Sequence, residues 1–223
     1  MTLGVLPQKN NRYALRILGS CGEFTSEELL RLSELTARFG SGRITATSRG
    51  TVELNGVAES ELEAAIEAVQ AAKLRLGGTG ATVRAVVACK GTDCRKGMFD
   101  VHTLACKLDE EFYGIDVPKK FKIGVFGCPN SLGKAMAQDV GIMPSFTETG
   151  KFEIYIGGLL GNRPVQGKCI PVPLQEDKLV DAIKYILDVY KANGIYPQRL
   201  RAVLDNKTEL WQEINCYFES LAK

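Results

Sequence analysis

Three short β-prone runs in the second half of the chain each end at a cysteine or a glycine, and this pattern most limits the fold. The runs, each with the residue that closes it, are 83–87 with Cys89, 121–126 with Cys128, and 152–156 with Gly157. Short apolar runs closed by turn residues are typical of buried strands. Helices are predicted between and after them, at residues 99–112, 133–139, 175–192 and 208–222. The helix at 175–192 has apolar residues at i, i+3, i+4 and i+7 spacing, which predicts that it lies on a sheet.

The first 80 residues predict a different order, β-α-β-β-α. A strand at 13–18 precedes Thr25-x-x-Glu28, a capping-box pattern that predicts the start of a helix. The expected apolar face of that helix is Leu29, Leu32, Leu35 and Phe39. Strands at 43–47 and 51–54, joined by Ser48-Arg49-Gly50, predict a hairpin.

A second helix of this region is expected to start at Ser60. Its predicted apolar face is Leu62, Ala65, Ile66, Val69 and Leu76. The glycine-rich segment 77–80 then reads as a linker. We therefore expect an α+β protein with one domain at 1–80 and another at 81–223.

Composition and charge exclude several classes of protein. The net charge is only +2, so there is no bulk electrostatic case for binding nucleic acid. No apolar stretch of about 18 residues is present, so no membrane span is predicted. The first ten residues lack a secretory pattern, so we expect a cytoplasmic location, where thiols stay reduced. An odd count of seven cysteines then favours metal or redox chemistry over a disulfide framework.

Cys89 and Cys94 give the sharpest local signal. They bracket a glycine-bearing turn after one predicted strand, and Cys128 follows another predicted strand in the same way. Three thiolates at two strand ends can converge if the strands are neighbours, and thiolates select iron–sulfur clusters or zinc. The alternatives are a structural zinc site and cysteines that merely pack in turns.

Four cations form the second candidate group. Lys120 and Lys122 alternate with Phe121, so they are predicted to share one strand face. Arg84 opens the strand that leads to Cys89, and Arg49 lies in the predicted hairpin. Each alone reads as a solvated side chain, but Arg84 and the lysine strand both lead directly into the cysteine turns. This predicts cations near the metal centre, as an oxyanion substrate or an acidic cofactor would require.

The remaining candidates have simpler interpretations. The single histidine, His102, reads as a helix residue and not a ligand. Cys106 and Cys216 read as core residues, whereas Cys21 and Cys169 have no paired partner in the sequence. The glycines of 157–161 indicate either a tight turn or close backbone approach to a large planar cofactor.

Taken together, these residues resemble the sulfite and nitrite reductases that carry siroheme and a 4Fe–4S cluster. Residues 1–80 are similar to the ferredoxin-like half-domain of that family, with the segment 43–54 at its arginine-bearing hairpin. Residues 81–223 are similar to its α/β domain that binds the cluster and siroheme. The larger enzymes contain two such halves, so this chain resembles the small members with one repeat.

The resemblance implies specific roles. It assigns cluster ligation to Cys89, Cys94 and Cys128, places Asn130 with them in cofactor binding, and assigns anion binding to Arg49, Arg84, Lys120 and Lys122. The family's fourth cluster cysteine, which bridges to the siroheme iron, is replaced here by Leu132. A leucine cannot ligate iron, so the bridge is absent in this sequence.

The resemblance further implies a siroheme- and 4Fe–4S-dependent reductase of sulfite or nitrite. It implies an external electron donor such as a ferredoxin, and a homodimer, because one repeat lacks the second half found in the larger enzymes. The rival is a non-catalytic iron–sulfur redox or scaffold protein, which Leu132 favours.

Overall fold

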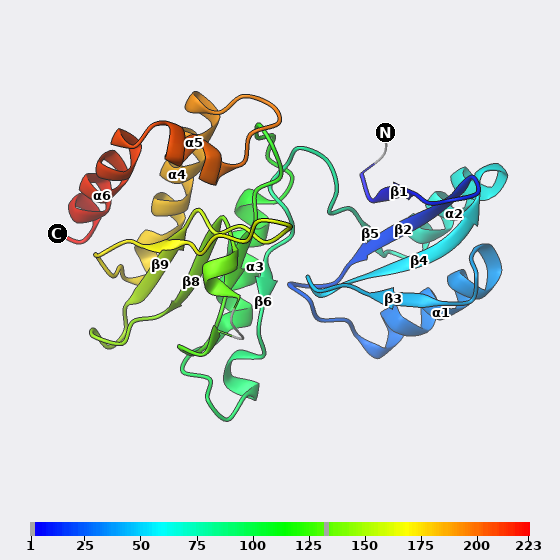
Figure 1. Cartoon of the computed structure of the whole chain (residues 1–223). Helices are drawn as coiled ribbons and strands as arrows, with labels where there is room; N and C mark the ends of the chain where they lie inside the picture. The colour runs from blue at the N-terminus through cyan, green and yellow to red at the C-terminus, as the bar shows by residue number, and fades with distance from the viewer. Residues whose placement is uncertain (1–2, 132–133) are drawn as a thin grey trace. The chain divides into compact units, whose positions relative to one another are not determined.

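The computed structural model describes residues 3–131 and 134–223, and it divides into two compact units, Met1–Gly80 and Ala81–Lys223. Figure 1 shows the helices and strands of both units. Each unit mixes helices and strands, so the α+β class predicted from the sequence is confirmed. The two units are described one at a time.

A five-stranded antiparallel sheet forms the base of the first unit. Its strands are β1 (Val5–Pro7), β2 (Arg12–Leu18), β3 (Ile44–Ala46), β4 (Thr51–Ala58) and β5 (Arg75–Leu76). The order is β1-β2-β4-β3, and β5 pairs with β2 beyond the end of β1. The predicted hairpin is confirmed as β3 and β4, and Gly50 takes the left-handed φ of 66° that closes its turn. The strand β1 and the strand β5 were not predicted.

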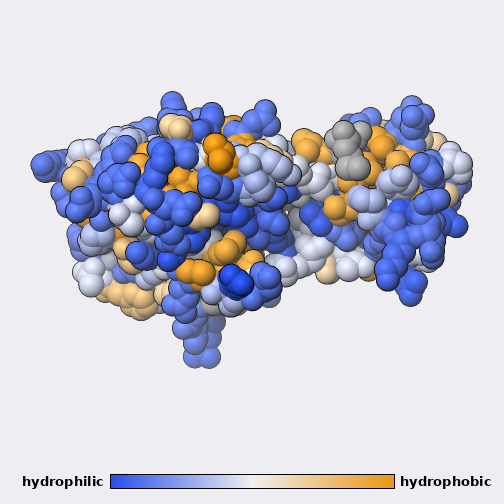
Figure 2. Space-filling view, turned by 45° about the horizontal axis from the view of Figure 1, so that its top comes forward, coloured by the Kyte–Doolittle hydropathy of each residue, from blue (hydrophilic) through white to orange (hydrophobic). Residues whose placement is uncertain are grey.

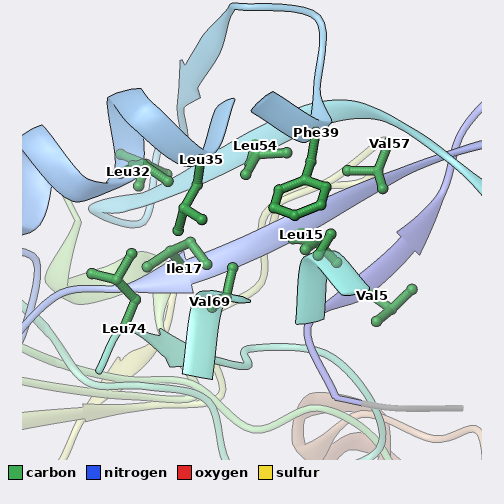
Figure 3. Packing of buried hydrophobic residues seen from close by; sticks show 12 residues of the cluster. Val5, Leu15, Ile17, Leu32, Leu35, Phe39, Leu54, Val57, Val69 and Leu74 are labelled. Atoms are coloured by element: carbon green, nitrogen blue, oxygen red, sulfur yellow. The ribbon is translucent and has the colours of Figure 1, made fainter. Parts of the chain in front are cut away.

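Two helices, α1 (Ser26–Phe39) and α2 (Leu62–Ala71), pack on this sheet. The capping box is present, since Thr25 Oγ1 accepts from the N–H of Glu28 and the Glu28 carboxylate accepts from the N–H of Thr25. Figure 3 shows the core between these helices and strands β2 and β4. Its labelled side chains are Val5, Leu15, Ile17, Leu32, Leu35, Phe39, Leu54, Val57, Val69 and Leu74.

Two positions on the predicted apolar faces differ from expectation. Leu29 is exposed, because the buried stripe of α1 runs through Leu32, Leu35 and Phe39. Leu76 belongs to β5 and not to the second helix, which ends at Ala71. The helix stops before Lys73, where φ is 57°, and the chain then turns back to pair with β2.

A mixed sheet of order β10-β9-β8-β7-β6 forms the second unit. Its strands are β6 (Val87–Ala88), β7 (Ile123–Val125), β8 (Val140–Pro144), β9 (Phe152–Ile156) and β10 (Lys168–Cys169). The strands β6, β7 and β8 are parallel, whereas β9 and β10 add on antiparallel. The strand β6 shares only Val87 with the predicted strand 83–87, β7 is a shorter strand inside 121–126, and β9 matches its prediction.

The helices of the second unit are α3 (Val101–Phe112), α4 (Leu179–Asn193), α5 (Leu200–Asn206) and α6 (Glu209–Leu221). Three of them lie inside or close to the predicted ranges, and α5 was not predicted. The expectation of a helix at 133–139 was wrong, because its described part forms only a short 3-10 turn at Ala135–Ala137. The chain there must turn directly into β8, whose strand Val140–Pro144 was also missed.

Among the described residues, no helix combines the length and the hydropathy needed to cross a bilayer. The face in Figure 2 is mostly hydrophilic, with apolar residues in small separate patches.

Candidate metal centre and cation cluster

Three cysteines line one small pocket at the ends of two neighbouring parallel strands. Cys89 follows β6, Cys128 follows β7, and Cys94 follows a 3-10 turn at Gly91–Asp93. All three border a cavity of about 140 Å³. This volume equals that of roughly five water molecules in the liquid. The three cysteines that the sequence singled out therefore border one pocket.

Glycines hold the two cysteine turns together. A Cβ on Gly127 would lie 2.8 Å from Val101 Cγ2 and 3.1 Å from Gly91 Cα, so only glycine fits there without a shift. The N–H of Gly127 donates to Cys89 Sγ at 3.1 Å, and the N–H of Met98 donates to the carbonyl of Gly127 at 2.8 Å. These two bonds join the turn after β7 to the loop after β6. The thiol positions are thus fixed by backbone contacts.

The three thiols that border the pocket are spread around it and are not grouped about a single point. Tetrahedral zinc with bonds of about 2.3 Å brings its thiolates within about 4 Å of one another. Within residues 3–131 and 134–223, no three Cys, His, Asp or Glu side chains are grouped closely enough to hold one ion. Thiolates spread around a cavity, with a backbone N–H on one sulfur, suit iron–sulfur ligation.

A larger hollow adjoins the cysteine pocket, and the two share Ser131. It has a volume of about 520 Å³ and mixes apolar and polar side chains: Pro129, Asn130, Ser131, Met136, Ala137, Leu159, Leu160, Pro164, Val165 and Gln166. Asn130 is exposed at its rim. Leu132 lies outside the described residues, so the structure gives no account of it.

The glycines of 157–161 have separate explanations. A Cβ on Gly158 would lie 2.3 Å from the carbonyl oxygen of Met136, so close packing against the backbone requires glycine there. Leu159 pairs with Val165 across the turn, with their N–H and carbonyl groups 2.9 Å apart in both directions. This supports the tight-turn interpretation, and the same turn forms one wall of the larger hollow.

The cations of the second unit gather at the start of the strands. Lys120 and Lys122 are half-buried, and Phe121 and Ile123 between and beside them are fully buried, as the alternation predicted. The N–H of Arg84 donates to the carbonyl of Phe121 at 2.8 Å, which places Arg84 on the adjoining strand segment. The pKa of Lys120 is lowered by burial and then by the charges of Arg199, Arg84 and Lys119.

Two residues of this cluster, Asp139 and Arg199, were missed in the sequence. Arg199 Nη2 lies 2.6 Å from Asp139 Oδ2, and the side chain of Asp139 is 1% exposed. Burial raises the pKa of Asp139, and the guanidinium of Arg199 opposes that rise. Neither residue lies in a motif, and 60 residues separate them, so no local pattern could have paired them.

The cations and the thiols occupy opposite ends of the parallel strands. Lys122 precedes β7 and Cys128 follows it, a separation of up to about 20 Å for six residues of extended chain. Arg84 and Cys89 flank β6 in the same order. The expectation that the cations of one chain lie beside its own metal centre is therefore not met in the second unit. Arg49 lies in the first unit, on the turn between β3 and β4.

The other cysteines stand apart from this pocket. Cys21 is buried with a φ of 50°, and Cys106 Sγ lies 3.4 Å from Nε2 of His102 on α3. Burial, with the nearby charge of Glu153, raises the pKa of the Cys169 thiol, which disfavours the reactive thiolate. The expectation of a core position for Cys216 was wrong, because it is exposed on α6, whose buried stripe passes through other residues.

The fold and the thiol pocket agree with the families that the sequence matches. Residues 79–210 match the nitrite and sulphite reductase 4Fe-4S domain, and residues 6–72 match the nitrite/sulfite reductase ferredoxin-like half domain. The chain belongs to the nitrite and sulfite reductase family.

Individual relatives support this assignment. The protein MJ0551 of Methanocaldococcus jannaschii is 36% identical over 134 residues, which cover 60% of this chain and 48% of that protein. The assimilatory-type sulfite reductase of Nitratidesulfovibrio vulgaris is 29% identical over 194 residues, 85% of each chain. The crystal structure of dissimilatory sulfite reductase I matches the fold with a TM-score of 0.80 at 15% identity, over 92% of this chain and 69% of that one.

Proposed function

We propose that this chain is a siroheme- and 4Fe–4S-dependent reductase of sulfite or nitrite that acts in the cytoplasm. The observation that carries the proposal is the convergence of Cys89, Cys94 and Cys128 on one pocket. A reducing compartment suits these residues, because cluster ligation requires free thiolates. When bound, the cluster and siroheme would supply electrons and a metal that binds the substrate.

The three cysteines would hold the cluster, and the chain around them would set its environment. The Gly127 N–H at Cys89 Sγ stabilises negative charge on that sulfur. Apolar packing of Cys89 against Phe126, Ala135 and Met143 limits water on one side. Both effects tune the reduction potential of a metal group held there.

The larger hollow is our candidate for the siroheme site. It adjoins the cysteine pocket, and its apolar wall residues Met136, Leu159 and Leu160 suit a flat macrocycle. Asn130, which lines the rim, would meet a polar group of such a cofactor.

The cations Arg49, Arg84, Lys120 and Lys122 are our candidates for binding the oxyanion. Positive side chains neutralise a developing oxyanion charge and can deliver protons to it. The lowered pKa of Lys120 makes this lysine a better proton donor than an ordinary one. An external donor such as a ferredoxin would supply the electrons.

The opposite placement of cations and thiols supports a homodimer. One chain cannot set its own Lys122 over its own Cys128 while β7 separates them. A second copy, related by a twofold axis, can present its cations to the thiol pocket of the first. Light scattering of the cofactor-loaded protein should therefore give the mass of a dimer at micromolar concentration, and a monomer would contradict this part of the proposal.

Anaerobic purification tests the metal centre directly. Iron and acid-labile sulfide should co-purify with the chain, and its absorption spectrum should contain both cluster and chlorin bands. Alanine at Cys89, Cys94 or Cys128 should lower the iron content, whereas Cys216→Ala on the exposed face of α6 serves as the matched control. Zinc, or no metal, in the anaerobic protein would refute the proposal.

A non-catalytic redox or scaffold role is the second candidate, and the leucine at position 132 favours it. Three cysteines leave one cluster iron without a protein thiolate. Turnover of sulfite or nitrite with a reduced artificial donor separates the two candidates. Protein that carries both cofactors but turns over neither anion would establish the second.

A further inference from the structure

The buried carboxylate of Asp139 joins two elements of the cation cluster. Asp139 lies directly before β8, and its Oδ2 accepts two hydrogen bonds. One comes from the backbone N–H of Lys122 at 2.9 Å, and the other from Arg199 Nη2 at 2.6 Å. One oxygen atom thus links the start of β7 to the start of α5.

This contact fixes the backbone of Lys122 on both sides. Its N–H is held by Asp139, and its carbonyl accepts from the N–H of Val140 at 3.0 Å. The flanking Phe121 and Ile123 are fully buried, so the strand cannot rotate about its axis without exposing them. Since side chains alternate along a strand, the direction of the Lys122 side chain follows from this clamp.

Arg199 reaches the cluster from a distant part of the sequence. It precedes α5, and its neighbour Gln198 is held by the Tyr190 hydroxyl, which donates to the Gln198 carbonyl at 2.6 Å. After burial, the charge of Arg199 is the largest influence that lowers the pKa of Lys120. Arg199 is therefore close enough to act on the cations as well as on Asp139.

A contribution to folding stability does not explain the ion pair between Asp139 and Arg199 well. Asp139 Oδ1 and Arg199 Nε are both buried without a hydrogen-bond partner among the described residues. Buried ion pairs with unsatisfied atoms often contribute less stability than apolar residues of the same size. The presence of such an ion pair beside Arg84, Lys120 and Lys122 indicates a role in the arrangement of these three cations.

We propose that Asp139 and Arg199 are positioning residues of the anion site: Asp139 holds the Lys122 backbone in place and offsets part of the repulsion among the clustered cations, and Arg199 fixes the Asp139 carboxylate before an anion binds. The inference rests on the proposed function, because it takes Lys120 and Lys122 as the groups that meet sulfite or nitrite. Asp139 and Arg199 act through Lys122 and do not themselves touch the anion.

The test is a double variant that removes the ion pair without changing the net charge. In Asp139→Asn with Arg199→Gln, asparagine matches aspartate in size, glutamine is shorter than arginine, and the site keeps its net charge. Calorimetric titration of the reduced full-length protein with sulfite should show about tenfold weaker binding. Amide hydrogen exchange at Lys122 should be faster, because a neutral acceptor holds the N–H less strongly.

A matched control uses the neighbouring ion pair of α5. Arg201 Nε lies 2.8 Å from Asp205, and Arg201→Gln with Asp205→Asn applies the same chemical change to a pair whose aspartate is 49% exposed, against 1% for Asp139. This control should bind sulfite within twofold of the parent. Arg199→Lys keeps the charge but loses the forked guanidinium, so it should bind about threefold more weakly than the parent and show faster Lys122 exchange.

The outcomes separate the two proposals. If the parent binds sulfite and the double variant binds it equally well, the positioning role is overturned and the proposed function stands. If the parent does not bind sulfite, the proposed function fails and the positioning role falls with it. Should the double variant not fold, unchanged sulfite affinity and unchanged Lys122 exchange in Arg199→Lys overturn the positioning role.

Discussion

The N–H of Gly127 lies 3.1 Å from Cys89 Sγ, and no side chain fits between the two turns at this point. The turn after β7 and the loop after β6 are therefore in backbone contact, and this contact brings the thiols to one pocket. Gly127 has no side chain, and this allows the two cysteine turns to lie in contact.

Gly127→Ala should lower the iron content of the purified protein. The new Cβ would lie 2.8 Å from Val101 Cγ2 and would push the two turns apart. Overpacking of this kind costs about 1–3 kcal/mol in unfolding free energy. Iron analysis together with denaturant unfolding checks the expectation.

Gly114→Ala is the control for that variant. Gly114 has a φ of 83° and open space around it, so alanine strains the backbone but meets no neighbour. This variant should lose stability while its iron content stays that of the parent. Equal iron loss in both variants would show that general destabilisation, and not closure of the pocket, releases the metal.

Lys122→Met should weaken anion binding more than it affects folding. The side chain of Lys122 is half-buried, whereas its neighbours Phe121 and Ile123 fill the core and remain in the variant. The free energy of unfolding should change by no more than about 0.5–1 kcal/mol. Sulfite or nitrite binding should weaken by about 1.5–3 kcal/mol, the scale of a charged hydrogen bond.

Titration calorimetry and thermal unfolding measure these two effects. Lys184→Met, on the exposed face of α4, is the matched control and should leave anion affinity unchanged. Equal affinity in Lys122→Met and in the parent would show that Lys122 is a surface lysine without a role in binding.

Sulfite affinity should fall in the alkaline range at a pH below that expected for an ordinary lysine. The pKa of Lys120 is lowered from 10.5 by burial and by Arg199, Arg84 and Lys119, and Asp139 opposes this. As the pH rises through the lowered pKa, the ammonium is lost and the anion loses a partner. Lys120→Arg stays charged, so its sulfite affinity should persist to higher pH.

Folding stability should respond to the same titration with the opposite sign. The folded state disfavours charged Lys120, so its pKa is lower when folded than when unfolded. The unfolded chain therefore binds more protons between the two values, and stability rises with pH across that window. Lys120→Arg should lack this rise, which unfolding measurements across the alkaline range can detect; an identical rise in the variant would assign it to other groups.

Thr25→Ala should destabilise the first unit by about 1 kcal/mol, because Thr25 Oγ1 caps the N–H of Glu28 at the start of α1. Chemical denaturation followed by circular dichroism measures this loss. Thr25→Ser keeps the hydroxyl and should unfold within about 0.5 kcal/mol of the parent. A serine variant as unstable as the alanine variant would indicate that the methyl group of Thr25, and not the cap, matters.

Local patterns predicted much of the fold. The capping box at Thr25 and Glu28 and the hairpin at Ser48-Arg49-Gly50 depend on residues close in sequence, and both were found as expected. The helix expected at 133–139 failed for a nonlocal reason, because the chain must turn into β8 to pair with β7 and β9. The alternation of Lys120, Phe121 and Lys122 was also read correctly, since a strand places neighbours on opposite faces.

The sequence by itself determined the class of protein, the three candidate thiolates and the alternation of Lys120 and Lys122 with the buried Phe121, because each depends on residue type at short spacing. Tertiary structure alone decided that Cys89, Cys94 and Cys128 border one pocket, that the cations lie at the other end of the strands, and that Asp139 and Arg199 meet. These contacts join residues far apart along the chain. Their distances are set by strand register and by close packing such as that at Gly127, and neither leaves a local pattern in the sequence.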